Sequence, residues 1–335
     1  MKLDFDKIKE ITKGAVRVID CNDHIRFYRF TQEQEDLYKE RLIDFYYQSL
    51  CTSGIRIVFK TDSKSLFLKV NVPELTLRKY FSFDVLVNDK TIGSISNFNM
   101  EDMPSKYIDV DLSIGKFSET FDLGEGEKKV CIYFPWSVVG ELEEIALDDG
   151  SFCEAIPCEK KILAFGDSIT QGYDALKPSQ HYVSRLADKL GADVINKAVA
   201  GDRFFPELTK TRDFVNPELI TCAYGTNDWD NVDEQEFMTT CRGFYENLSN
   251  TYSNARIFAI SPIWRTDELE DRKCGRFSDI EKRIQDIVSD LKNITFVSGY
   301  DFVPHDKTYY ADFWVHPNDK GFETYFEKLY NKITK

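Results

Sequence analysis

The first 150 residues alternate apolar and polar side chains over short stretches that are separated by turn residues. A period of two is the pattern of strands that bury one face of a sheet. Many short strands of this kind predict a jelly-roll-like β-sandwich over residues 1–154. Residues 31–49 fit a helix or a further strand, and the pattern leaves both open. The predicted strands are 55–59, 66–72, 80–87, 91–95, 107–112 and 129–134.

From about residue 155 the pattern changes to strand, helix, strand. Short apolar runs now alternate with longer segments in which apolar residues recur every three or four positions. This alternation predicts a parallel sheet of five strands, covered by helices on both faces, over residues 155–335. Residues 149–160 form the expected linker. The predicted strands are 162–165, 193–196, 219–224, 256–260 and 295–298, and the predicted helices are 181–190, 233–252, 277–291 and 320–333.

Small polar residues and glycines follow three of these predicted strands. They are Gly166-Asp-Ser168, Ala200-Gly201 and Gly225-Thr-Asn227. Ligands of open parallel sheets bind at the carboxyl ends of the strands, so three such clusters at one edge indicate a site there. Each cluster alone also has a simpler explanation, because Ser168 could cap a helix and the others could be turn residues.

Composition narrows the class of partner. The chain has 335 residues and a net charge of -14, which disfavours nucleic acid and anionic membrane surfaces as partners. Its eight cysteines form no CxxC pair and it has four histidines, so neither a zinc site nor another cofactor is expected. The absence of an apolar signal segment and the scattered cysteines predict a cytoplasmic protein. The acidic run 228–234 lacks the spacing of a calcium loop and fits a helix N-terminus better.

An acyl-transfer site needs a hydroxyl nucleophile, a base and donors for the oxyanion. Ser168 is the candidate nucleophile. The backbone N–H groups of Ser168 and Gly201, together with the amide of Asn227, are the candidate oxyanion donors. Of the four histidines, at positions 24, 181, 305 and 316, His316 lies in a loop that Pro317 stiffens and that leads into the last helix. Asp312 precedes it by four residues and could orient the imidazole.

These blocks resemble the SGNH (GDSL-type) hydrolases. Gly166-Asp-Ser-Ile-Thr170, Gly201, Gly225-Thr-Asn-Asp228 and His316-Pro-Asn-Asp319 occur in the order and rough spacing of that family, over residues 158–335. The resemblance implies a three-layer α/β/α fold of flavodoxin-like order, a metal-free Ser-His-Asp mechanism and ester substrates. One departure is that the family usually places the acid three residues before the histidine, where this chain has Phe313. Asp312 can complete a triad, or the site is a Ser-His dyad whose ring is oriented by Asp301 or a backbone carbonyl.

A β-rich first half before such a domain is similar in layout to the carbohydrate esterases of family two. This similarity implies an acetylated carbohydrate, a small molecule or an oligosaccharide, as substrate. A lysophospholipase or thioesterase and an inactive carbohydrate-binding protein are the alternatives. An aromatic-rich sandwich could also form a homodimer. Aromatic residues near the motifs could stack on sugars or simply pack in the core. The candidate substrate-binding residues are Asp167, Tyr173, Arg203, Trp229 and Trp314.

Overall fold

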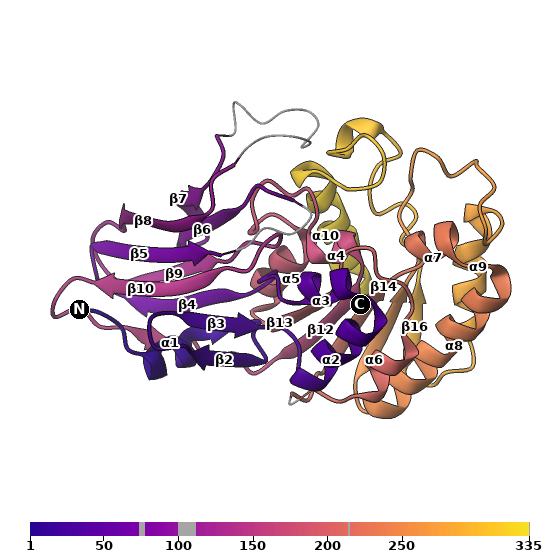
Figure 1. Ribbon diagram of the computed structural model, residues 1–335, viewed down its shortest axis with the longest axis horizontal. Coiled ribbons are helices and arrows are strands. Elements are labelled where there is room, and N and C mark those ends of the chain that lie inside the picture. Colours follow the sequence, from indigo (N-terminus) through magenta and orange to yellow (C-terminus); the bar gives the residue numbers. More distant parts are fainter. Residues whose placement is uncertain (74–77, 100–111, 214, 335) are drawn as a thin grey trace.

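The computed structural model describes residues 1–73, 78–99, 112–213 and 215–334. Two parts lie side by side: antiparallel sheets from the first half of the chain, and a parallel sheet with its helices from the second half (Figure 1). The predicted fold class is therefore confirmed. Residues 107–111 of the predicted strand 107–112 lie outside the described ranges.

The β-sandwich consists of two antiparallel sheets around one apolar core. Strand β5 shows why the sequence folds this way, because its alternate residues Leu66, Leu68, Val70 and Val72 are fully buried in that core. Helix α1 (Phe5–Ile11) buries Ile8 and Ile11 in the same core. One sheet has the order β2-β3-β10-β5-β8 and the other β1-β4-β9-β6-β7, with β11 paired to β4. The strands are β1 Thr12–Lys13, β2 Arg17–Asp20, β3 Ile25–Tyr28, β4 Arg56–Thr61, β5 Ser65–Val72, β6 Ser82–Val87, β7 Lys90–Ser96, β8 Gly115–Asp122, β9 Lys128–Tyr133, β10 Glu141–Leu147 and β11 Glu154–Ala155.

The parallel sheet has the order β13-β12-β14-β15-β16, which is the flavodoxin-like order. All its neighbouring strands pair in parallel, and the carboxyl ends of β12, β13 and β14 lie next to each other. The edge at which the sequence predicts a site is therefore continuous. The strands are β12 Lys161–Gly166, β13 Asp193–Ala198, β14 Leu219–Ala223, β15 Arg256–Ile260 and β16 Ile294–Val297.

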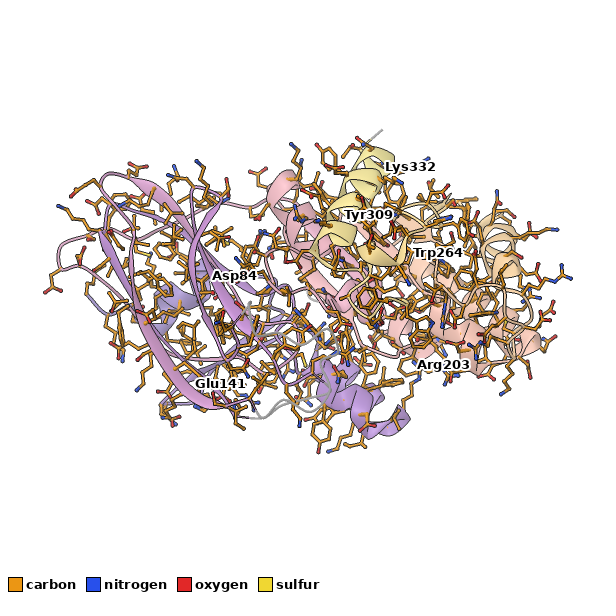
Figure 2. All side chains as sticks on the ribbon, turned by 90° about the horizontal axis from the view of Figure 1, so that it is seen from above. Asp84, Glu141, Arg203, Trp264, Tyr309 and Lys332 are labelled. Carbon is orange, nitrogen blue, oxygen red and sulfur yellow. The ribbon has the colours of Figure 1, made fainter. Side chains whose placement is uncertain are left out.

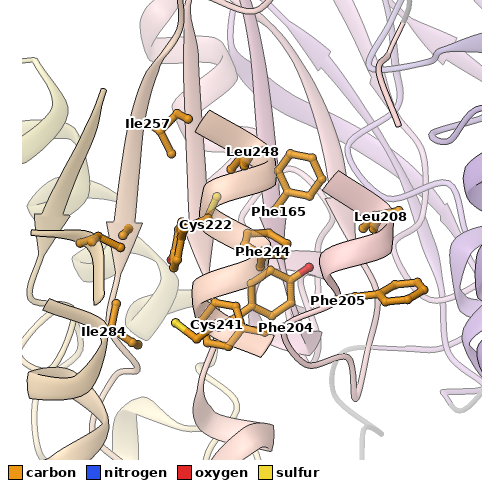
Figure 3. Close-up of a cluster of buried hydrophobic side chains, with 14 of the residues drawn as sticks. Phe165, Phe204, Phe205, Leu208, Cys222, Cys241, Phe244, Leu248, Ile257 and Ile284 are labelled. Atoms are coloured by element: carbon orange, nitrogen blue, oxygen red, sulfur yellow. The ribbon is translucent and has the colours of Figure 1, made fainter. Parts of the chain in front are cut away.

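Helices cover both faces of the parallel sheet. Alternate strand residues face opposite sides, so that Phe165 and Cys222 pack against Phe244 of α8 (Figure 3), whereas Ala164 belongs to the cluster under α5 and α10. This arrangement is the three-layer architecture that the resemblance implies. The helices are α4 Ser168–Gln171, α5 Tyr182–Leu190, α6 Pro206–Lys210, α7 Thr226–Asn231, α8 Glu234–Thr251, α9 Phe277–Val288 and α10 Asp319–Ile333, with a 3₁₀ turn at Lys307–Tyr309.

Residues 31–49, left open between helix and strand, form helices α2 (Gln32–Arg41) and α3 (Ile43–Ser49). A capping box between Thr31 and Gln34 starts α2. Although they precede most of the sandwich in sequence, these helices lie against the α/β part (Figure 1). Tyr38 of α2 is buried in the core cluster that also contains residues of β12 and α8. The chain leaves the sandwich at β11 and enters the parallel sheet at Lys161.

Buried polar contacts join the two parts. The guanidinium of Arg29 is fully buried and donates to the carbonyls of Asn196 and Ala198, at 2.7 and 2.8 Å. Asp84, a residue of β6 labelled in Figure 2, accepts from both the N–H and the hydroxyl of Ser179. Within the described part of the chain, no helix is both long and apolar enough to cross a membrane.

Candidate active site

Ser168 lies where the buried strand β12 turns into the short helix α4. Asp167 caps this helix by accepting the N–H of Ile169 at 3.0 Å, and Ser168 is its first residue, 7% exposed. Gly166 permits the sharp turn, because a Cβ there would overlap the hydroxyl of Thr170. The strand, the cap and the glycine together hold the Ser168 hydroxyl in one place.

His316 and Asp312 continue from Ser168 in a hydrogen-bonded chain. Ser168 Oγ lies 2.9 Å from His316 Nε2, and His316 Nδ1 lies 2.8 Å from Asp312 Oδ2. If Nδ1 carries the ring proton and donates a hydrogen bond to the carboxylate, Nε2 is free of a proton and can accept the proton of the serine hydroxyl. This is the geometry in which a serine can be activated as a nucleophile.

The loop before His316 bends so that Asp312 reaches the ring from four residues away. Phe313 has a left-handed backbone with φ of 56°, which turns the chain back on itself. Asp312 Oδ1 then accepts the N–H groups of Trp314, Val315 and His316 at 2.9, 2.9 and 3.1 Å. Asp301, the alternative acid, contacts His305 instead, at 3.2 Å.

Two carboxyl groups of the site have shifted pKa values in opposite directions. Burial acts to raise the pKa of Asp312, but the hydrogen bond and charge of His316 and the backbone N–H groups outweigh it and lower this pKa. Burial raises the pKa of Asp167 to about 7. Asp312 is thus kept ionised beside His316, while Asp167 titrates near neutral pH.

Gly201 and Asn227 follow the ends of β13 and β14 and are linked to each other. The side-chain amide of Asn227 donates to the carbonyl of Asp202 at 3.0 Å, next to Gly201. Gly201 has a left-handed φ of 79°, which favours glycine at this position. The loop before it is fixed by Ala200 N–H donating to the Gln171 side chain at 2.8 Å. The predicted oxyanion donors therefore lie on strand ends adjacent to that of Ser168.

Residues 164–323 match the family described as GDSL-like Lipase/Acylhydrolase. The C-terminal half of this chain is a GDSL-like domain. The match spans Ser168, Gly201, Asn227, Asp312 and His316, so the resemblance carried by these motifs is confirmed at the level of the family. No curated protein sequence matches the chain.

Solved structures share the whole two-part arrangement. A salicylyl-acyltransferase from a tetracycline biosynthetic pathway is 20% identical, with a TM-score of 0.76. The alignment covers 96% of this chain and 93% of the acyltransferase chain. A family two carbohydrate esterase from Cellvibrio japonicus is 16% identical, with a TM-score of 0.65 and coverages of 98% and 95%. One from Clostridium thermocellum, in complex with cellohexaose, is 16% identical, with a TM-score of 0.63 and coverages of 84% and 92%. The family match supports an acyl hydrolase, and the solved structures show that the fold is shared.

Helix α2 supports the Gly201 loop of the GDSL-like domain from outside that domain. Asp202 is fully buried and accepts from the hydroxyl of Tyr38 at 2.9 Å and from Arg41 at 2.7 Å. Phe45 of α3 also approaches this loop, because a Cβ on Gly201 would lie 3.4 Å from its ring. These residues lie more than 150 positions from Gly201 in sequence, and no motif marks them.

The other three histidines lie away from Ser168. Burial lowers the pKa of His181 to about 3, and its Nε2 lies 3.0 Å from the Ser184 hydroxyl. His24 contacts acidic residues of the sandwich, and His305 stacks on Trp264. Among the histidines, all of which the structure describes, His316 is therefore the base candidate for the GDSL-like domain.

The predicted substrate-binding residues of the GDSL-like domain fall into two groups. Trp314 and Arg203 are partly exposed, with Arg203 labelled in Figure 2. Asp167 and Tyr173 are buried, and Tyr173 packs its ring 5.5 Å from that of His316. Trp229 has no exposed surface and donates its Nε1–H to the carbonyl of Gly275. Its position therefore differs from the predicted one, because the ring packs in the core and not on a surface that could bind a sugar.

One cluster has the composition of a metal site. Ligand atoms of Asp174, Asp312 and His316 lie within 4.8 Å of one another. Both carboxylates already have other partners, since Asp174 is paired with Arg78 and Asp312 with backbone N–H groups. The donor set therefore fits hydrogen bonding to the imidazole better than the binding of a divalent cation.

Proposed function

We propose that this protein is a serine carboxylesterase that removes acetyl groups from acetylated carbohydrates. The observation that carries the proposal is the hydrogen-bonded chain from Ser168 through His316 to Asp312. Nucleophilic acyl transfer requires a hydroxyl, an imidazole and a carboxylate that are hydrogen-bonded in this order. The match of residues 164–323 to the GDSL-like acylhydrolase family supports the same chemistry.

In the proposed mechanism, Ser168 Oγ attacks the ester carbonyl while His316 Nε2 takes its proton. The oxyanion that forms is stabilised by the N–H groups of Ser168 and Gly201 and by the amide of Asn227. The C–O bond then breaks and the alcohol leaves with the proton from His316. Water then attacks the acyl-enzyme while His316 takes a proton from it. The bond from the acyl carbon to Ser168 Oγ breaks, the proton passes from His316 to Oγ, and acetate leaves.

Exposed aromatic residues support a carbohydrate as the substrate. Phe313 and Trp314, next to the proposed triad, are 48% and 44% exposed, and exposed aromatic rings can stack on the apolar faces of sugars. Two structural neighbours are carbohydrate esterases, one of them bound to cellohexaose.

The first test is hydrolysis of an aryl acetate by the Ser168→Ala variant. We expect kcat to fall by roughly 10³-fold or more with an unchanged circular dichroism spectrum, because the nucleophile is lost and the fold is not. Ser184→Ala is the matched control, because it removes another serine hydroxyl that contacts a histidine, His181, and it should retain activity. Equal turnover by Ser168→Ala and the wild type would refute the proposal.

A chain-length series separates the proposed activity from the alternatives. A deacetylase should lose kcat/KM steeply beyond acetyl or propionyl esters, whereas a lysophospholipase or thioesterase should gain from longer chains. Addition of an acceptor alcohol distinguishes hydrolysis from the acyl transfer named for one structural neighbour, because a transferase would form a new ester in place of acetate.

A further inference from the structure

A second carboxylate lies beside the ring of His316. Asp174 follows α4 in a left-handed conformation, with φ of 66°, and its side chain is fully buried. Its Oδ2 lies 3.5 Å from His316 Nδ1, the same ring nitrogen that lies 2.8 Å from Asp312. The imidazole is thus close to two carboxylates.

The β-sandwich holds Asp174 in this position. Arg78, from the segment before β6, donates to both oxygens of Asp174 through Nε and a terminal nitrogen, at 2.8 and 3.1 Å. The hydroxyl of Tyr80 donates to the same carboxylate at 3.3 Å. Trp136 donates its indole N–H to the carbonyl of Ala175 at 2.9 Å. The loop behind His316 is therefore fixed by three residues that come from outside the GDSL-like domain.

We propose that Asp174 is a positioning residue for His316, and that Arg78 of the sandwich sets its orientation. The inference rests on the proposed function, in which His316 becomes an imidazolium during acyl transfer. Asp312 accepts a hydrogen bond from the Nδ1–H group, and Asp174 adds a second negative charge beside the positive ring. The sandwich is then a part of the catalytic site as well as a neighbouring domain.

The charges around His316 explain why the proposed role requires both Asp174 and Arg78. A buried negative charge needs a nearby partner of opposite sign. Arg78 supplies that charge to Asp174 through two hydrogen bonds. Burial acts to lower the pKa of Arg78, but its hydrogen bond and ion pair with Asp174 outweigh burial and raise this pKa. The other titratable groups that face the ring in the described structure are Asp312, Asp167 and Tyr173.

The test is the Asp174→Asn variant, since asparagine tolerates the left-handed backbone. It leaves the Arg78 cation unpaired near His316, which disfavours the imidazolium. We expect the acidic limb of kcat/KM for an aryl acetate to move to lower pH by about one unit. The value of kcat should fall about tenfold with KM unchanged, as expected for an interaction made mainly in the transition state. Removing both charges, in Asp174→Asn with Arg78→Met, should return the limb toward its wild-type position.

Arg56→Met is the matched control. Arg56 is another sandwich arginine that pairs with an aspartate of the second half, Asp188, at 2.6 Å, and its partners in the described structure do not include His316. It should leave the pH limb unchanged even where it lowers stability. If Asp174→Asn behaves like Arg56→Met, with no movement of the limb, the proposal is overturned and Asp174 is only structural.

A spectroscopic readout separates this inference from the proposed function. The protonation of His316 can be followed by NMR of the labelled imidazole, which needs no turnover. Asp174→Asn should lower the midpoint of that titration whether or not esters are hydrolysed. A wild type without esterase activity would refute the proposed function, whereas an unmoved midpoint would refute the role of Asp174.

Discussion

At the scale of single residues, Phe313 explains how the site accommodates an unusual spacing. The acid precedes the histidine by four positions, and the left-handed turn at Phe313 folds Asp312 back under the ring. A phenylalanine in this conformation carries a steric cost because its Cβ crowds the neighbouring carbonyl. The contact between Asp312 and His316 is therefore maintained against local backbone strain.

Substitutions at Phe313 should reveal this strain. Phe313→Asn should raise the free energy of unfolding by roughly 1 kcal/mol, because asparagine tolerates the left-handed region, whereas Phe313→Val should lower it. Urea denaturation of both variants measures the difference. Equal effects of Asn and Val would mean that the backbone at Phe313 is unstrained.

Local motifs suffice to locate several residues of the candidate site. Ser168, Gly201, Asn227 and His316 each lie in a short motif, so their neighbours in sequence identify them. Asp174 and Asp202 are marked by no such pattern, because their partners Arg78 and Tyr38 lie 96 and 164 positions away. No spacing within a motif encodes such contacts.

At the scale of elements, helix α2 has a role that its position in sequence does not suggest. Its apolar and polar residues fit a helix or a strand, and the capping box at Thr31 starts the helix that is observed. Tyr38 and Arg41 then bind the buried Asp202, beside the Gly201 loop. An element of the first half thereby contacts the loop of the second half that carries Gly201.

Removal of the Arg41 charge should therefore cost stability and activity together. Arg41→Met leaves the Asp202 carboxylate buried with one partner fewer, and we expect the free energy of unfolding to fall by roughly 2–3 kcal/mol. The value of kcat should fall as well, because the loop that carries Gly201 loosens. The control is Arg242→Met, which removes the ion pairs of Arg242 with Glu246 and Asp290 on the surface. Here the free energy of unfolding should change by no more than about 1 kcal/mol. Similar losses in both variants would argue against a special role for α2.

At the scale of the whole molecule, buried carboxyl groups predict how stability depends on pH. Burial raises the pKa of both Asp167 and Asp228 to about 7. Between about pH 4 and pH 7 the folded state then binds more protons than the unfolded state, so these groups make stability fall as pH rises. Above pH 7 their contribution levels off.

Asp228→Asn tests this dependence. The stability of the wild type relative to this variant should decrease by roughly 3 kcal/mol between pH 5 and pH 8, because the asparagine side chain has no proton to lose. Urea denaturation at both pH values measures it. Asp290→Asn is the control: the pKa of Asp290 is lowered by its hydrogen bond to Arg242, so it is ionised throughout this range. A constant difference for Asp228→Asn would show that Asp228 titrates normally.

The sequence by itself determined the structural class of each half and the motifs that follow the parallel strands. Those motifs pointed to Ser168, Gly201, Asn227 and His316, because periodicity, caps and turns depend on neighbours along the chain. The tertiary structure decided what distant segments do to one another. It placed α2 and α3 on the α/β part, put Trp229 in the core and brought Asp312 within 2.8 Å of His316. It also set Arg78 and Asp174 beside the same ring, since buried charges must find partners wherever the fold supplies them.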